Sequence, residues 1–152
     1  MIEPLLIGRI VLILICAVAW WLDVTKRIIP NWLCLVAFAA GVAFTAWQVP
    51  TELGWHLLHA GVALAVGIFF YAINFVGGGD AKFYAGVAVW FSFWQGMFLL
   101  LCVSLATLVM FGSWFLLRRL RGIPVERSAK SDSGKFPYAL GIGGGAVLAL
   151  FL

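Results

Sequence analysis

Charged residues are scarce in this sequence of 152 residues, since they make up only 11% of it, whereas hydrophobic residues make up 64%. The mean hydropathy is accordingly high, at +1.09. A soluble domain of this length could not bury so much apolar surface. We therefore expect the chain to lie in a lipid bilayer.

Cysteine is also scarce. Cys16, Cys34 and Cys102 each stand alone in an apolar segment, and no Cys-x-x-Cys spacing occurs. We interpret all three as small packing residues rather than metal or redox ligands. His56 and His59 could share one helix face and such a pair can bind zinc, but no third ligand is evident. The sequence therefore predicts neither a metal nor a cofactor.

Six apolar segments are candidates for membrane helices, which take roughly 20 apolar residues each. Their predicted boundaries are residues 4–22, 32–48, 55–76, 83–93, 97–117 and 137–152. The fourth is shorter than a usual span. Trp20 and Trp21, near the end of the first segment, are typical of the aromatic belt at a membrane interface. We predict an all-α, polytopic membrane protein in which residues 1–152 form a single domain.

The basic residues predict the orientation of these spans. Lys26 and Arg27 follow the first span, Lys82 follows the third, and a basic loop at residues 118–135 follows the fifth, whereas the loops after the second and fourth have no basic residue. Basic loops stay in the cytoplasm, so both termini are predicted on the outer side. The formal net charge of +4 reflects these loops and their contact with anionic lipid, which excludes nucleic acid as a partner.

Two acidic residues have a setting that the other four lack. Asp23 ends the first apolar segment, and Asp80 follows the glycines Gly77, Gly78 and Gly79 after the third. The predicted topology puts both at the cytoplasmic border of the membrane. A carboxylate at that depth is costly unless it is paired or used, so both are candidate functional residues.

Two interpretations of this pair remain open on spacing alone. If the fold brings Asp23 and Asp80 together, they would share a proton, so that one activates water while the other polarises a peptide carbonyl. Glycines before Asp80 would then let a substrate backbone come close and free Asp80 from a rigid helix. In the structural alternative, Asp23 caps a helix end beside Lys26 or Arg27, and Asp80 caps the fourth helix beside Lys82.

A family resemblance rests on two sequence elements: Asp23 followed by Ile29-Pro30-Asn31, and the segment Gly77-Gly78-Gly79-Asp80-Ala81-Lys82. Together they resemble the type IV prepilin peptidases, which are polytopic membrane aspartic peptidases with a Gly-x-Gly-Asp (GxGD) motif. Phe136-Pro137-Tyr138, before the glycine-rich last segment, is also similar to the C-terminal end of that family.

The resemblance implies a role for each matching residue. Asp23 and Asp80 would be the catalytic pair, and Gly77 and Gly79 would shape the loop that carries Asp80. Lys82 would tune Asp80, bind substrate or anchor the loop to the membrane surface. Larger family members also have paired Cys-x-x-Cys motifs and an N-methyltransferase activity, and this chain lacks those cysteines. The resemblance is therefore to the short CpaA/TadV-like form of Flp (tight-adherence) pilus systems, without methyltransferase activity.

The function implied is that of an aspartic endopeptidase in the bacterial inner membrane. It would cleave the leader peptide of a prepilin or pseudopilin at the cytoplasmic face, with pilus assembly proteins as candidate partners. The basic loop at residues 118–135 is expected to contact lipid rather than the substrate leader, which is also basic. The alternative is a non-enzymatic carrier or a scaffold subunit of a secretion or pilus machine. A carrier favours ionisable groups near the bilayer midplane and repeat symmetry, and the sequence has neither.

Overall fold

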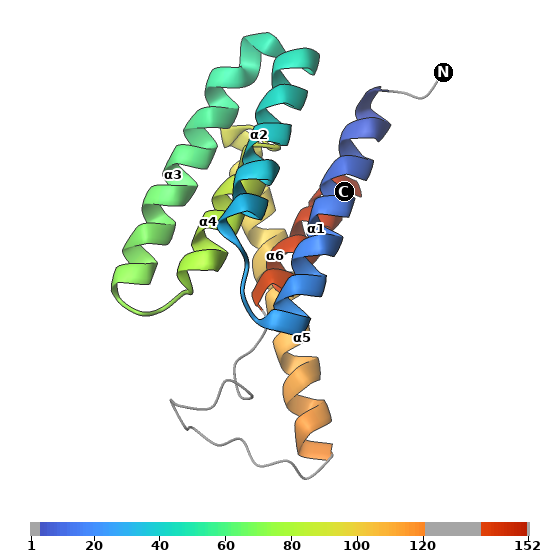
Figure 1. Ribbon diagram of the computed structural model, residues 1–152, viewed down its shortest axis with the longest axis vertical. Coiled ribbons are helices and arrows are strands. Elements are labelled where there is room, and N and C mark those ends of the chain that lie inside the picture. The colour runs from blue at the N-terminus through green and yellow to red at the C-terminus, as the bar shows by residue number, and fades with distance from the viewer. Residues whose placement is uncertain (1–3, 121–137, 152) are drawn as a thin grey trace.

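The computed structural model describes residues 4–120 and 138–151. Within these ranges the chain forms α-helices and two short 3₁₀ turns, and no strand, which confirms the all-α prediction (Figure 1). In chain order the elements are α1 (Pro4–Lys26), α2 (Asn31–Gln48), η1 (Pro50–Glu52), α3 (Leu53–Ala72), α4 (Gly78–Ala88), η2 (Phe93–Gln95), α5 (Gly96–Leu120) and α6 (Tyr138–Phe151).

Four of the described helices, α1, α2, α3 and α5, are long and apolar enough to cross a membrane. Helix α4 has only 11 residues and helix α6 has 14. A polytopic membrane protein is therefore confirmed, whereas the count of six spans and the outer position of both termini stay predictions. Most of the predicted basic loop, from residue 121 onward, and Phe136-Pro137 lie outside the described residues.

Local backbone geometry explains where the first helices end. Helix α1 continues to Lys26 and closes with Arg27 in the left-handed region, at φ 53°, so Asp23 lies in the last helical turn. Pro30 then precedes α2 with an extended backbone, which suits a residue that cannot donate a backbone hydrogen bond. The α1–α2 and α3–α4 connections lie at the same end of the molecule (Figure 1).

The largest difference from the predicted boundaries concerns α4. It begins at Gly78, five residues before the predicted start at residue 83, and α3 ends at Ala72 rather than at residue 76. Gly78 and Gly79 therefore lie inside a helix instead of stopping one. Tertiary packing overrides the low helix propensity of glycine here, because most of α4 after its first turn is buried between α2, α3 and α6.

Two buried histidines contact the chain just after the C-terminal end of α4. The Nδ1 atoms of His56 and His59, on α3, lie 2.9 Å and 3.0 Å from the carbonyl oxygens of Val89 and Phe91. Carbonyls at the end of a helix lack intrahelical partners, and these side chains supply them. The histidines thus hold the connection between α4 and η2.

Helix α6 packs against α1 and α5, and its glycines allow this close contact. A Cβ on Gly141 would overlap Thr107 of α5, and one on Gly145 would lie 2.3 Å from the Cα of Val103. The Arg9 guanidinium lies 5.4 Å from the ring centroid of Phe151, so a cation–π contact joins the start of α1 to the end of α6.

Replacing Gly145 with alanine tests this packing. We expect Gly145→Ala to lower the free energy of unfolding by about 1–3 kcal/mol, because the obstacle to its Cβ is backbone, which cannot rotate away. Gly112→Ala on α5 is the control, since its Cβ meets nothing within 4 Å. Unfolding in mixed micelles measures both, and equal stabilities would contradict the packing described.

Candidate active site

Asp23 is held by the last helix. Its side chain is only 8% exposed, and its Oδ2 accepts a hydrogen bond of 3.0 Å from the backbone N–H of Ala139. Ala139 is the second residue of α6, so this N–H has no acceptor within its own helix. The N-terminus of a helix also carries partial positive charge. The start of α6 therefore stabilises a negative charge on Asp23.

Asp80 lies in the first turn of α4, close enough to Asp23 for the two carboxyls to interact. Burial raises the pKa of the Asp80 carboxyl to about 6, and the negative charge of Asp23 contributes to this rise. The fold thus brings the two sequence-predicted aspartates to one site, although they belong to different helices.

Neither aspartate has the simple capping role that spacing alone allowed. Asp23 does accept an N–H from a helix N-terminus, but that helix begins more than a hundred residues later in the chain. The N-cap position of α4 is occupied by Gly77, and Asp80 lies three residues inside the helix.

Gly77 gives Asp80 room rather than conformational freedom. Its backbone is ordinary, with φ −67° and ψ 142°, so any residue could adopt it. A Cβ at this position would, however, lie 2.6 Å from Oδ2 of Asp80. A Cβ on Gly79 would make only ordinary contacts, at 3.5 Å from Ile29. The suggestion that the glycines free Asp80 from a helix is therefore wrong, since Asp80 is helical.

Lys82 links the two sequence elements that carried the family resemblance. Its Nζ donates a hydrogen bond of 3.1 Å to Oδ1 of Asn31, the first residue of α2. Ile29 is buried beside Gly79 in the same region. The Ile29-Pro30-Asn31 segment therefore packs on the glycine-rich start of α4, and the exposed hydrogen bond from Lys82 stabilises this contact.

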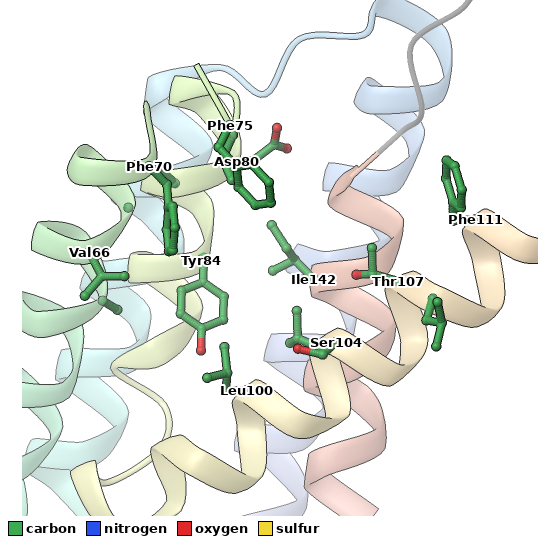
Figure 2. Close-up of a pocket in the computed structure, with 16 residues that line it drawn as sticks. Val66, Phe70, Phe75, Asp80, Tyr84, Leu100, Ser104, Thr107, Phe111 and Ile142 are labelled. Atoms are coloured by element: carbon green, nitrogen blue, oxygen red, sulfur yellow. The ribbon is translucent and has the colours of Figure 1, made fainter. Parts of the chain in front are cut away.

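An apolar cavity of about 580 Å³ opens beside Asp80. Helices α3, α4 and α5 form its walls, and Ile142 of α6 closes one side (Figure 2). Asp80 lies at one end, and Tyr84 points into the cavity from the next turn of α4. Its other polar residues are Ser104 and Thr107, both on α5. A cavity of this size and polarity suits an apolar ligand oriented by a few polar groups.

Sequence reasoning missed three contributors to this site: Trp20, Ala139 and Tyr84. The Nε1–H of Trp20 donates a hydrogen bond of 3.1 Å to the carbonyl oxygen of Ala139, so this indole is not merely an interfacial anchor. Helical spacing offered a signal for the side chains, because Trp20 precedes Asp23 by three residues and Tyr84 follows Asp80 by four. A backbone contact such as that of Ala139 leaves no trace in the sequence.

Comparison with known families agrees with this geometry. The profile of the type IV leader peptidase family matches residues 10–112, which include both aspartates and all of α2, α3 and α4. The chain belongs to this family. Membership gives a peptidase role in a membrane environment with prepilin-type substrates. Searches of curated proteins and of solved structures return no significant match.

The chemistry available at the site is that of two carboxyls whose charges interact, one of which, Asp80, lines an apolar cavity. Because burial and the negative charge of Asp23 oppose ionisation of Asp80, one carboxyl can carry a proton while the other is ionised. Among the residues that the structure describes, no three His, Cys, Asp or Glu side chains are grouped so that they could hold a metal ion.

Gly77→Ala tests the space needed by Asp80. We expect this substitution to displace the Asp80 carboxylate and to lower leader-peptide cleavage by about tenfold or more, since misplacement by about 1 Å is costly in catalysis. Gly79→Ala should lose less, because its Cβ meets only ordinary contacts. Gly61→Ala on α3, with open space around its Cβ, is the control. Equal cleavage rates for Gly77→Ala and Gly61→Ala would contradict this role.

Proposed function

We propose that this protein is a membrane aspartic endopeptidase that removes the leader peptide of a prepilin or pseudopilin with Asp23, Asp80 and an activated water. One observation supports the proposal: Asp80 lines an apolar cavity and lies near enough to Asp23, on another helix, for the two charges to interact, and burial together with this interaction raises the pKa of Asp80 to about 6. Family membership supplies the class of reaction.

The surroundings of the two carboxyls suggest different roles in peptide hydrolysis. Burial opposes ionisation of both carboxyls, but only Asp23 also receives the Ala139 N–H and lies near Arg27, so we assign Asp23 as the general base and Asp80 as the acid. Asp23 takes a proton from water, whose oxygen attacks the scissile carbonyl carbon, while Asp80 gives its proton to the carbonyl oxygen. When the intermediate collapses, the C–N bond breaks, Asp23 protonates the leaving nitrogen, and Asp80 regains its proton from the hydroxyl.

The cavity accounts for the substrate class. Val66 of α3 and Leu100 and Leu108 of α5 line it and are also exposed, so it opens toward the lipid. An apolar substrate helix lying in the bilayer can enter there and bring its end to Asp80. This geometry suits the hydrophobic helix of a small prepilin. That a basic leader precedes this helix and is cut after a glycine at the cytoplasmic membrane face is what the resemblance to the prepilin peptidases implies.

The remaining assignments follow from charge and composition. Lys26, Arg27 and Lys82 are exposed at the end of the molecule that carries the aspartates, which favours a site facing the cytoplasm of a bacterial inner membrane. Under this orientation the predicted segments 83–93 and 137–152 act as short spans, both termini lie outside, and residues 1–152 form one domain. Because the described cysteines are single, buried and free, we assign the chain to the short CpaA/TadV-like form without methyltransferase activity.

Replacing each aspartate tests the catalytic pair. We expect Asp23→Asn and Asp80→Asn each to reduce cleavage of the prepilin encoded in the same genome by about 10³-fold or more, the scale on which essential catalytic groups act. Asparagine keeps an acceptor for the Ala139 N–H at position 23, so the fold is retained. Incubation of the purified protein in nanodiscs with this prepilin, followed by mass spectrometry, measures the loss.

Glu52→Gln is the matched control, since Glu52 is an exposed acidic residue at the opposite end of α3. It should cleave like the wild type. Normal cleavage by either aspartate variant would refute the catalytic pair, and the absence of any peptide product from the wild type would favour the carrier or scaffold alternative.

The pKa of Asp80 predicts the alkaline side of the pH–rate profile. Above a pH of about 6 the carboxyl loses the proton that it must donate, so kcat/KM should fall about tenfold per pH unit once this loss dominates. Burial and Asp23 both raise this pKa, so a more exposed or less crowded Asp80 would shift the fall to lower pH. Initial rates between pH 5 and pH 9 measure it, and a rate that increases throughout this range would contradict the assignment.

A further inference from the structure

Ala139 is held by α1 through both of its backbone polar groups. Its carbonyl oxygen accepts the indole N–H of Trp20 at 3.1 Å, and its own N–H donates to Oδ2 of Asp23 at 3.0 Å. Ala139 is completely buried, so water does not compete for either group. Trp20 and Asp23 lie three residues apart and so share one face of α1. One residue of α6 is thereby fixed between two side chains of α1.

Gly143 makes this arrangement possible. A Cβ there would lie 2.4 Å from the Nε1 of Trp20 and 3.2 Å from the Cβ of Cys16. The indole therefore occupies space that any larger residue would fill. Gly144, the next residue, has its nearest neighbour at 3.7 Å, the Cβ of Ala106, so alanine fits there.

We propose that Trp20 is a positioning residue for catalysis, which acts through the backbone of Ala139 to fix the orientation of the Asp23 carboxylate and to stabilise its negative charge. This inference rests on the proposed function above. It makes α6 part of the active site, although α6 lies outside the family match, which ends at residue 112.

The geometry also distinguishes the two oxygens of Asp23. Oδ2 is bound by the Ala139 N–H, so we assign the proton taken from water to Oδ1. A carboxylate held at one oxygen cannot rotate freely, and its free oxygen then keeps one direction toward the substrate. The other charged groups that act on Asp23 are Arg27, at the end of α1, and Asp80 on α4. Neither replaces the hydrogen bond, because Arg27 is exposed and Asp80 is acidic.

Three variants of the full-length protein test this role in nanodiscs with the same prepilin as substrate. Trp20→Phe removes the indole N–H and keeps an aromatic ring, and Gly143→Ala displaces the indole. We expect both to lower kcat by about tenfold, with KM within about twofold of wild type, as for a loss confined to the transition state. Gly144→Ala, one residue further along α6, should match the wild type.

The pH–rate profile separates positioning from general stability. Without the Trp20 hydrogen bond, the Ala139 backbone is no longer held in place, and its N–H binds the ionised Asp23 carboxylate less well. Asp23 then becomes harder to ionise, so the acid limb should move to higher pH by about 0.5 unit or more in Trp20→Phe and Gly143→Ala. A purely structural role would lower the amount of active protein and leave the limb where it is. Thermal unfolding of each variant confirms that folded protein is being compared.

An unchanged kcat and acid limb in folded Trp20→Phe would overturn the proposal. If that variant does not fold, Gly143→Ala decides the question by the same two measurements. The outcome is distinct from failure of the proposed function, because Asp23→Asn and Asp80→Asn would then still be inactive while Trp20→Phe cleaves normally. Activity in both asparagine variants would instead remove the basis of both proposals.

Discussion

The hydrogen bond between Asp23 and Ala139 joins the first described helix of the chain to the last, and the site depends on it. It brings α6 against α1, where the glycines of α6 allow close contact with both α1 and α5. Packing of α4 against α2, α3 and α6 then sets Asp80 near Asp23. The cost of burying the Asp23 carboxylate is partly offset by the hydrogen bond and the partial positive charge of the α6 N-terminus.

In the proposed function, the cavity binds the substrate helix and the two carboxyls hydrolyse the peptide bond. The apolar walls formed by α3 and α5 can receive a helix from lipid without exposing backbone, since a substrate helix satisfies its own hydrogen bonds. Hydrolysis, however, needs an extended peptide segment and a water molecule, and both are more stable at the polar membrane interface than in the hydrocarbon core. Asp80 lies at one end of the cavity, in the first turn of α4, so binding and chemistry can occur at adjacent places (Figure 2).

Hydropathy and charge were sufficient to predict the all-α membrane fold, because lipid imposes helices on any long apolar segment. The two aspartates were identifiable because their position would otherwise be costly. The start of α4 was not predictable from glycine propensity, since its helix is stabilised by burial against neighbours far away in sequence. The hydrogen bond of Trp20 was also not predictable from the sequence, because its partner is a backbone group of α6, 119 residues away.

As the proposed catalytic base, Asp23 would depart from the usual trade-off between stability and activity. Catalytic groups are commonly a burden on folding, so that removing them makes an enzyme more stable. Here the same carboxylate anchors a helix, and a substitution that abolishes the acceptor would loosen the fold as well as the chemistry. The loss of activity in an Asp23→Ala variant would therefore combine lost catalysis with lost folding. An inactive but well-folded descendant of this protein would have to retain a hydrogen-bond acceptor at this position.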